Sequence, residues 1–508
     1  MHRPSHIRVR TYRLVLALTG ALVITAGDVA AVRAQCISEA SPYGINVHAP
    51  QGSSLVRLMD EVQSCGMGWI RIDMVWAWVE PSQDTFSWSI YDSIVGAARA
   101  RGLHIFATIS QTPAWATTGP AGTGVPTNAA DYYDVCYRAA TRYRDSIRHW
   151  GMWNEPNLSQ FWSGSRAQYI NLILNNGADA IHAASPEAKV CGPELAHLNS
   201  GSWDVWLTDC ITQAGSRLDI VTHHVYGNNH TVVTDRLEKS PTWPWDPPSV
   251  KQVLQNTGWF GRPFWLTEVG WESDEVGEAN QANYYTGLLN NWFTGQPARS
   301  WIHKVFFYEL NDTQAFSQYS FGILGPEPAY ARKAAFTAYQ NFIAAHPAPP
   351  FVPAKVQGAN PPHLAVDVRL SPAGLSWAPV TCATSYDVYF GTESPGVLVS
   401  SQTTTTYNPG TLARKTTYYW RIDTWSGTEK TTGDVWQFTT AGSPADFDQD
   451  DDVDQTDFGY LQRCLSGEGG VHEPDCAAAD LDGDTDVDGH DVAQFLECMG
   501  GPDREPNC

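Results

Sequence analysis

Short apolar runs alternate with longer amphipathic segments over residues 43–345 of the 508-residue chain. The longer segments have helical periodicity. In "SLVRLMDEVQSCG", for example, Leu55, Leu58 and Val62 fall on one face, and a glycine follows the pattern. The short runs predict eight strands, at 43–48, 69–76, 104–110, 148–155, 189–195, 219–226, 263–271 and 304–310.

Eight strands that alternate with helices over about 300 residues have the size and rhythm of a (β/α)8 barrel. A doubly wound open sheet alternates in the same way, but this chain has no glycine-rich phosphate loop after its first strand. We therefore predict an α/β fold of the TIM-barrel type for residues 35–345. The carboxyl ends of the strands are where a barrel of this kind does its chemistry.

The pattern changes after residue 345. Residues 346–363 are proline-rich, which predicts a stiff linker, and residues 364–441 hold alternating β-branched and aromatic runs that predict a small β-sandwich. Within the sandwich, "LARKTTYYWRI" resembles the strand F region of fibronectin type III modules. Leu412 then stands six residues before the corner tyrosine, Tyr418.

The tail, residues 445–508, contains an internal repeat with a period of 34 residues. "DFDQDDDVDQTD" (446–457) and "DLDGDTDVDGHD" (480–491) both place acidic residues at positions 1, 3, 5, 7, 9 and 12, and a helical pattern follows each. A solvated acidic run is the usual meaning of clustered charge, but the duplicated offsets favour oxygen ligands for Ca²⁺. The predicted ligands are Asp446, Asp448, Asp450, Asp454, Asp457, Asp480, Asp482, Asp484, Asp488 and Asp491.

This pair of loops resembles a type I dockerin. The resemblance implies structural calcium and a cohesin-type protein partner, although such repeats also serve as a folded tail alone. The loops depart from the calcium-loop rule at position 6, where Asp451 and Thr485 replace the turn glycine. We expect the second loop, which has Gly483, to bind calcium more tightly than the first.

The net charge of −22 belongs almost entirely to this tail, in which nineteen acidic residues and two arginines give −17. The rest of the chain is close to balanced and shows no basic patch, so nucleic acid is not an expected partner.

Residues 1–34 combine a basic start, an apolar run and a small residue before Gln35, which predicts a secretory signal peptide. A single membrane anchor is the rival interpretation, but the apolar run is short for a span. Ten cysteines agree with export, and no CxxC pair suggests zinc. The spacing permits near-neighbour pairs such as Cys191–Cys210 and Cys464–Cys476, and the sequence leaves the connectivity open.

Two glutamates stand at the carboxyl ends of predicted strands in aromatic surroundings. Glu155 lies in "WGMWNEPNLSQFW" and Glu268 in "FWLTEVGW". Opposed carboxylates at a barrel mouth suit glycoside hydrolysis, in which one protonates the leaving oxygen and the other meets the charge growing at the anomeric carbon. Neighbouring Trp150, Trp153 and Pro156 would raise the pKa of Glu155 by desolvation and keep it a proton donor.

"WNEP" at the fourth strand and "LTEVGW" at the seventh resemble the large clan of retaining (β/α)8 glycoside hydrolases, which includes cellulase family 5 and the family 39 xylosidases. The resemblance implies that Glu155 is the acid/base, that Glu268 is the nucleophile and that Asn154 bonds the sugar 2-hydroxyl. "HHVYG" is similar to the clan's H-x-Y motif. His224 and Tyr226 would then be substrate-site residues, with the tyrosine touching the nucleophile.

"RIDMVWAWVEP" is similar to the second strand of family 39-like members, with Arg71 and Asp73 facing inward and Ile70, Ile72 and Met74 facing the helices. Arg71 is expected to contact the sugar, or else only to pair with Asp73. Trp76 is either a sugar platform or packing, and the same choice applies to Trp78, Trp115 and Trp162. Where many clan members have a strand-eight tryptophan, this chain offers Phe307 or Tyr308, and His223 is expected to be structural.

The sequence thus predicts a secreted, modular, retaining glycoside hydrolase for a polysaccharide or oligosaccharide, with no cofactor in the chemistry. Its two carboxyl groups should lie about 5–5.5 Å apart. The alternative is a non-catalytic carbohydrate-binding or adhesion protein on an inactive barrel. Retention of both carboxylates together with Asn154 and Tyr226 argues against that alternative.

Overall fold

The computed structural model describes residues 38–48, 53–197, 202–239, 248–294, 300–312, 320–369 and 374–502, and the single residues 504, 506 and 508. The predicted signal peptide at residues 1–34 lies outside these residues. In the described part of the chain, no helix has the length and apolar character needed to cross a membrane.

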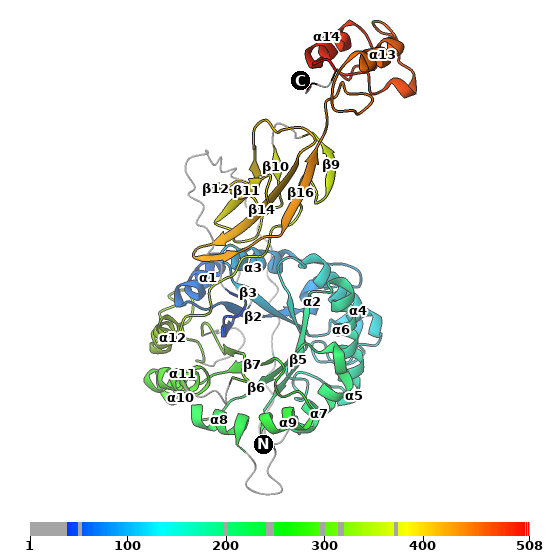
Figure 1. Cartoon of the computed structure of the whole chain (residues 1–508). Helices are drawn as coiled ribbons and strands as arrows, with labels where there is room; N and C mark the ends of the chain where they lie inside the picture. The colour runs from blue at the N-terminus through cyan, green and yellow to red at the C-terminus, as the bar shows by residue number, and fades with distance from the viewer. Residues whose placement is uncertain are drawn as a thin grey trace, which may run out of the picture. The chain divides into compact units, whose positions relative to one another are not determined.

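The first domain is a closed barrel of eight parallel strands that follow one another around the ring in chain order (Figure 1). The ring closes where the last strand pairs with the first, with Gly44 opposite Phe306. All eight predicted strands are confirmed. They are β1 Tyr43–Asn46, β2 Trp69–Val75, β3 His104–Ser110, β4 His149–Met152, β5 Lys189–Ala196, β6 Ile220–His224, β7 Phe264–Val269 and β8 Lys304–Phe307.

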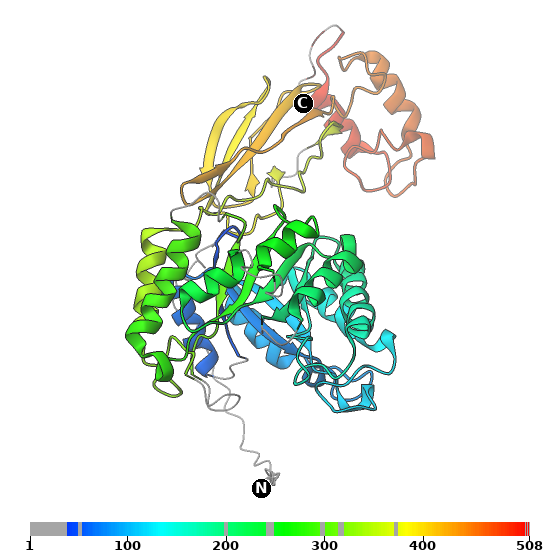
Figure 2. The same ribbon diagram turned by 90° about the horizontal axis from the view of Figure 1, so that it is seen from below.

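Helices surround this barrel on the outside (Figures 1 and 2). Helix α1 buries Leu55, Leu58 and Val62, the face that its periodicity predicts. The described helices of the domain are α1 Ser53–Cys65, α2 Trp76–Val79, α3 Ser89–Arg99, α4 Ala129–Arg142, α5 Arg166–Gln168, α6 Asn176–Ala184, α7 Trp203–Ala214, α8 His230–Glu238, α9 Val250–Asn256, α10 Ser273–Val276, α11 Glu278–Phe293 and α12 Ala334–Ala345, with the π-helix η2 Tyr169–Asn175 and the short 3₁₀ helices η1 Ala114–Ala116 and η3 Gly215–Arg217.

The described residues of the domain form two hydrophobic clusters, because strand side chains alternate between the barrel interior and the helices. Ile70, Ile72 and Met74 belong to the large cluster, which also contains the buried helix residues. A smaller cluster consists of Trp69, Phe106, Cys191, Ile220, Trp265 and Phe306. Trp69 lies two and four residues before Arg71 and Asp73 on β2, so its side chain points to the same side of the strand, into the barrel. The small cluster therefore fills the barrel interior on the amino-terminal side of these polar residues.

The second domain consists of two small sheets. β10 pairs with β13, and the larger sheet has the order β12-β11-β14-β16-β9, with β15 added on β14. Tyr418 accepts a hydrogen bond from the backbone N–H of Ala413 at 2.9 Å, while the fibronectin resemblance stays a prediction. The strands are β9 Ala365–Val368, β10 Leu375–Ser376, β11 Ser385–Gly391, β12 Val397–Gln402, β13 Thr406–Tyr407, β14 Thr417–Ser426, β15 Glu429–Thr431 and β16 Val435–Thr440.

The predicted linker, 346–363, is wrong in its second half. Val356 is 1% exposed and lies in the core of the sandwich domain. The backbone of Asn360 exchanges hydrogen bonds with Ser376 at 2.9 and 2.8 Å. The proline-rich sequence here lacks the alternation of a strand, so its contribution to this core was not visible in the pattern.

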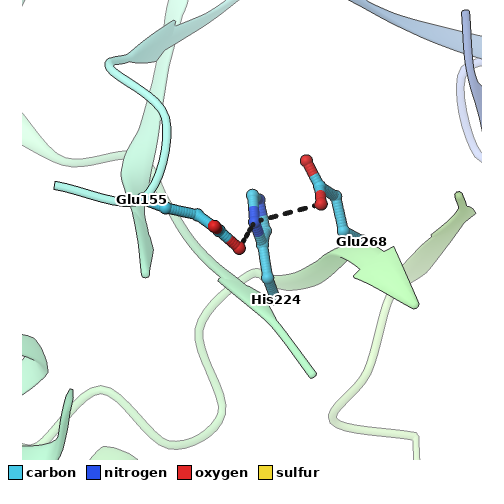
Figure 3. A group of neighbouring side chains, drawn as sticks. All are labelled: Glu155, His224 and Glu268. Carbon is cyan, nitrogen blue, oxygen red and sulfur yellow. Dashed lines mark hydrogen bonds and ion pairs between the residues drawn. The ribbon is translucent and has the colours of Figure 1, made fainter. Parts of the chain in front are cut away.

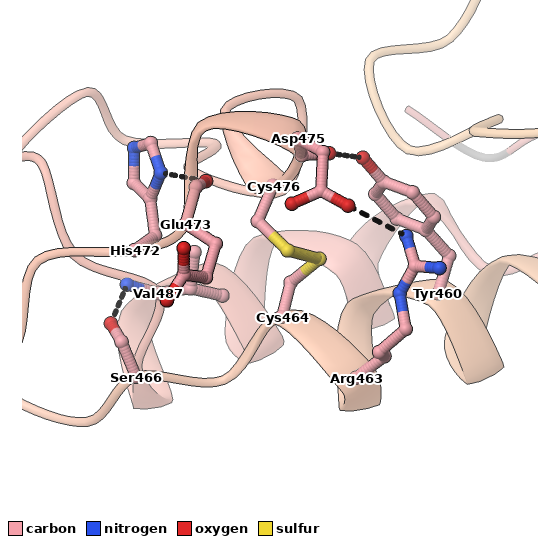
Figure 4. The surroundings of a disulfide bond; sticks show 9 residues. All are labelled: Tyr460, Arg463, Cys464, Ser466, His472, Glu473, Asp475, Cys476 and Val487. Carbon is pink, nitrogen blue, oxygen red and sulfur yellow. Dashed lines mark hydrogen bonds and ion pairs between the residues drawn. A yellow bond between two sulfur atoms is a disulfide. The ribbon is translucent and has the colours of Figure 1, made fainter.

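The tail contains two helices, α13 Gln455–Cys464 and α14 Gly489–Cys498, and the short turn η5 Pro474–Cys476. Leu461 and Phe495, one from each helix, are fully buried in a shared core. The Cys464–Cys476 disulfide, one of the pairs that the spacing permits, joins α13 to η5 (Figure 4), and Cys498 pairs with Cys508.

The pair Cys191–Cys210, which the spacing permits, does not form, because both residues are free and buried. Cys191, on β5, belongs to the cluster inside the barrel, whereas Cys210, on α7, packs in the outer cluster between strands and helices. The strand wall of the barrel separates the two thiols.

Replacing Val356 with Ala in a fragment of residues 350–441 should lower the free energy of unfolding by about 2 kcal/mol, since a buried side chain loses two methyl groups. Val352 is 59% exposed, so Val352→Ala is a matched control with almost no expected effect. Denaturant unfolding followed by tryptophan fluorescence measures both variants. Equal stability of the two would show that the segment is a linker after all.

Candidate active site

Three side chains meet at the carboxyl ends of strands β4, β6 and β7. Glu155 follows β4, His224 ends β6 and Glu268 lies near the end of β7. Nδ1 of His224 lies 3.0 Å from a carboxylate oxygen of Glu155 and 3.5 Å from one of Glu268 (Figure 3). One ligand atom from each residue lies within 4.8 Å of the other two. The two glutamates predicted from sequence therefore face each other at the barrel mouth.

The backbone that presents Glu155 is strained. Trp153 and Glu155 have φ values of +75° and +43°, which side-chain-bearing residues rarely adopt. Their N–H groups donate to the carbonyls of Ile109 and Glu194, at 3.1 and 3.0 Å, which ties the loop to the neighbouring strands. Such residues cost about 1–3 kcal/mol each and concentrate at functional sites.

The aromatic surroundings of Glu155 serve mainly as packing. Trp150 and Trp153 are almost fully buried in the large cluster, and Trp153 contacts Trp162 at a ring distance of 5.3 Å. The Trp153 indole also donates to the carbonyl of Phe161. The crowding noted in the sequence thus holds the turn after β4 in place.

The Glu268 carboxylate receives donors on both of its oxygens. Arg71 donates to Oε1 at 2.9 Å and Tyr226 donates to Oε2 at 2.7 Å. Burial raises the pKa of Glu268 above its ordinary value, although nearby His224 and Arg71 partly offset this effect. The predicted contact between Tyr226 and Glu268 is present.

Arg71 is 2% exposed and bonds four side chains at the barrel mouth. Besides Glu268, its guanidinium donates to Asn46 at 2.7 Å, to Asn154 at 2.9 Å and to Glu194 at 2.8 Å. Asp73, the partner weighed from sequence, lies farther away at 3.9 Å. Arg71 therefore neutralises and positions several polar groups and does not simply pair with Asp73.

Glu194 is a site residue that the sequence analysis missed. It is fully buried on β5, has a φ of +51°, and accepts from Thr108 at 2.8 Å as well as from Arg71. Gly151 makes room for it, because a Cβ there would lie 2.1 Å from the Glu194 carboxylate. The available signal was a glutamate inside the otherwise apolar run "KVCGPEL".

His224 is charged in this arrangement. Burial opposes its positive charge, but the carboxylates of Glu268, Glu155 and Glu194 outweigh burial and raise its pKa to about 9. The neighbouring His223 instead faces His197, with 3.2 Å between ring nitrogens, and burial lowers its pKa. The expected structural role of His223 agrees with this placement.

Trp76 is not a surface platform. It is fully buried, its indole donates to Glu80 at 2.8 Å, and its ring packs on Trp115 and Tyr132. The prediction of Trp76 as a sugar contact is corrected, because the chain turns into helix α2 at this residue and directs it into the outer core.

Tyr308 remains as the aromatic residue after strand eight. Phe307 is fully buried and stacks on Tyr285 at 3.8 Å. Tyr308 is partly exposed, and its ring lies 6.3 Å from that of Tyr226.

The acidic loops of the tail form two matching arrangements. Carboxylate oxygens of Asp446, Asp448 and Asp457 lie within 4.8 Å of one another, and so do those of Asp480, Asp482 and Asp491. Asp457 and Asp491, at position 12, are buried and accept from backbone N–H groups at the start of their own loops, at 2.6 Å in each case. These carboxylate oxygens are ligands of the kind that calcium prefers.

Both loops make the turn at position 6 without glycine, since Asp451 and Thr485 have φ values of +80° and +81°. The first loop also holds Gln449 at +63°, whereas the second has Gly483 at the same position. The first loop therefore carries more backbone strain than the second.

Two curated relatives match short stretches of the chain. A beta-xylosidase from Geobacillus stearothermophilus is 31% identical over 87 residues, which is 16% of this chain and 16% of that protein. A beta-xylosidase from Caldicellulosiruptor saccharolyticus is 34% identical over 90 residues, 17% of this chain and 18% of that protein. The chain thus matches less than a fifth of the length of these relatives.

Solved structures similar to this chain include a family 39 glycoside hydrolase from Bacteroides cellulosilyticus WH2. It has a TM-score of 0.48 and 18% identity, over 70% of this chain and 71% of that one. A monomeric beta-xylosidase from Caulobacter crescentus CB15 has a TM-score of 0.48 and 20% identity, over 61% and 69% of the two chains.

Two family models match the chain. The dockerin type I domain matches residues 444–495, which contain both acidic loops. The model described as cellulase (glycosyl hydrolase family 5) matches residues 38–295, just over half of the chain and including Glu155, His224 and Glu268. The chain belongs to the cellulase family, glycosyl hydrolase family 5, and carries a dockerin type I domain in its tail.

Proposed function

We propose that this protein is a retaining glycoside hydrolase that cleaves O-glycosidic bonds in an oligosaccharide or polysaccharide. The carrying observation is the close approach of Glu155 and Glu268, which have carboxylate oxygens within 4.8 Å of each other. Retaining enzymes hold their carboxyl groups about 5–5.5 Å apart, whereas inverting enzymes need about 6.5–9.5 Å to admit a water molecule.

The surroundings of the two carboxylates support different roles. Glu268 accepts from Arg71 and Tyr226, which stabilise an ionised carboxylate suited to attack the anomeric carbon. Among the described side chains, Glu155 has a hydrogen-bonding partner only in His224. Glu155 therefore lacks the pair of donors that stabilises Glu268 as an anion, and an acid/base must carry a proton in one step and give it up in the other.

In the first step, Glu268 forms a bond to the anomeric carbon while Glu155 donates its proton to the departing oxygen. In the second step, Glu155 takes a proton from water, whose oxygen displaces Glu268 and releases the sugar. The side-chain oxygen of Asn154 accepts a hydrogen bond from Arg71. The side-chain N–H groups of Asn154 can therefore donate to the sugar 2-hydroxyl. Tyr308 would line the sugar site beside Tyr226.

We further propose that the protein is exported and that its dockerin domain holds two structural calcium ions and binds a cohesin-type protein. The matching loops and the secretory pattern of residues 1–34 support this proposal. The ions would stabilise the tail, and no cofactor takes part in the chemistry at the barrel.

Release of reducing sugar from a panel of polysaccharides, together with turnover of aryl β-glycosides, tests the hydrolase proposal. An aryl β-xyloside is the first choice because the curated relatives are named beta-xylosidases. Activity on any member that is lost in Glu268→Ala supports the proposal. Inactivity on the whole panel, with carbohydrate binding retained, would favour a non-catalytic binding protein.

The two glutamates should fail differently when each is replaced by alanine. Glu268→Ala should lower kcat by at least about 10³-fold on every substrate, because no nucleophile remains. Glu155→Ala should keep rapid release of a very good leaving group such as 2,4-dinitrophenolate, which needs no proton. For substrates with a poor leaving group, the rate of the first step should fall by about 10²–10⁴-fold. Burst kinetics with both kinds of leaving group separate these outcomes, and equal loss of the dinitrophenyl burst in both variants would contradict the assignment.

On the acid side of the pH profile, the midpoint of the fall in kcat/KM should lie above the ordinary glutamate pKa of 4.5, because burial raises the pKa of Glu268. Glu268 must be ionised to attack, so kcat/KM is full above its pKa and is lost as the pH falls through it. Tyr226→Phe removes a donor that lowers this pKa and should move the midpoint upward by about one pH unit. Tyr308→Phe is the matched control, and an unchanged midpoint in Tyr226→Phe would contradict the nucleophile assignment.

Calcium should govern the tail and leave the barrel unaffected. Without a cation, the crowded carboxylates repel one another, so chelation should reduce the helix content of an isolated tail of residues 445–508 while the full chain keeps its hydrolase activity. Asp457→Asn disables the first loop and leaves the second to bind calcium, and Asp491→Asn does the reverse. The calcium affinity that remains should be higher in Asp457→Asn, because the first loop is more strained than the second. Calorimetry and circular dichroism measure both effects, and no gain of helix with calcium would mean that the repeat is only an acidic run.

A further inference from the structure

A second polar cluster lies at the barrel mouth beside the catalytic glutamates. His48 follows β1, Asp73 lies on β2 and Glu309 follows β8, and these three strands are neighbours in the ring. Nε2 of His48 lies 3.1 Å from Oε2 of Glu309 and 3.1 Å from the Tyr308 hydroxyl oxygen. Nδ1 of His48 lies 3.6 Å from Oδ2 of Asp73. None of these contacts has a part in the chemistry assigned to Glu155 and Glu268.

This cluster belongs to the same site as Glu268. Arg71 bridges the two, since its Nη1 lies 2.9 Å from Glu268 and 3.9 Å from Asp73. On the other side, Tyr308 connects the cluster to Tyr226, whose hydroxyl bonds Glu268. A sugar bound at Glu268 therefore lies within range of the charges of Asp73 and Glu309.

Negative charge exceeds positive charge at this mouth. Four carboxylates, those of Asp73, Glu194, Glu268 and Glu309, face the three basic groups of His48, Arg71 and His224, and Glu155 is not counted because it carries the proton that it donates. Lys333, whose charge also acts on Glu309, is paired with Asp312 at 2.7 Å, and this pair adds no net charge.

Two carboxylate oxygens of the cluster also lack donors. Oδ1 of Asp73 and Oε1 of Glu309 are buried, and the described residues supply neither with a hydrogen bond. Glu309 is only 1% exposed, so its unpaired oxygen is costly unless a bound molecule donates to the cluster. Hydroxyl and ammonium groups donate hydrogen bonds, whereas a carboxylate only accepts them and repels like charge.

We propose that Asp73 and Glu309 make the sugar site beside Glu268 selective for glycones that are neutral or carry an ammonium group, and that they exclude uronic acids. This proposal rests on the hydrolase function and adds the class of sugar. The two carboxylates act on specificity and take no part in bond cleavage.

The test compares 4-nitrophenyl β-glucoside with 4-nitrophenyl β-glucuronide, which differ only in a hydroxymethyl group against a carboxylate. The wild-type ratio of kcat/KM should favour the glucoside by about 100-fold or more. Glu309→Gln and Asp73→Asn keep the side-chain shape and remove the charge, so each should reduce the ratio by about tenfold. Glu187→Gln, on the exposed surface, is the matched control and should leave the ratio unchanged.

Competition gives a second readout that needs no turnover of a hexoside. Against turnover of the best neutral aryl glycoside, D-glucuronate should inhibit more weakly than D-glucose, and Glu309→Gln should narrow that difference. Equal handling of acidic and neutral sugars by the wild type, or unchanged selectivity in both cluster variants, would overturn the proposal. Absence of turnover on every aryl glycoside and polysaccharide would instead reject the hydrolase function.

Discussion

The active site depends on one buried cation, the guanidinium of Arg71. It bonds side chains from β1, β5 and β7 and from the loop after β4, and it is 2% exposed. Burial opposes its charge, but Glu194 and Glu268 hold its pKa above the usual range, so it stays charged. A buried charge of this kind is tolerated only when its partners are in place. Folding of the barrel and assembly of the site are therefore coupled through Arg71.

Packing supplies the rigidity that this cation requires. Aromatic residues close the barrel interior below the polar layer, and buried tryptophans fix the loop that carries Glu155. The left-handed conformations of Glu155 and Glu194 place strained residues directly beside the carboxylates that need orienting. Strain at these positions persists because the surrounding core and the backbone hydrogen bonds to β3 and β5 outweigh it.

Periodicity predicted most of the fold, because strands and helices of a barrel alternate with different hydrophobic repeats. Glu155, Glu268, Asn154 and Tyr226 were predictable since they lie within short motifs at strand ends. Glu194 was not, because it acts through contacts with Arg71 and Thr108, which are distant in the sequence.

The wrong predictions share a physical cause, which is that periodicity does not give the direction of a side chain where an element ends. Trp76, a candidate sugar contact in the sequence, lies where β2 turns into α2 and points into the outer core. Val356 joins the sandwich core from an irregular proline-rich segment. The spacing also permitted a Cys191–Cys210 pair, because sequence proximity does not reveal which side of the strand wall each thiol occupies.

The central claim is that Glu268 attacks the sugar and Glu155 transfers the proton. Its most direct test is to supply azide to the two alanine variants during turnover of an activated aryl β-glycoside and to determine the anomeric configuration of the glycosyl azide by NMR. Azide in Glu155→Ala should intercept the glycosyl–enzyme and give the β-azide, whereas azide in Glu268→Ala should replace the missing nucleophile and give the α-azide. The opposite configurations would contradict the assignment of both residues.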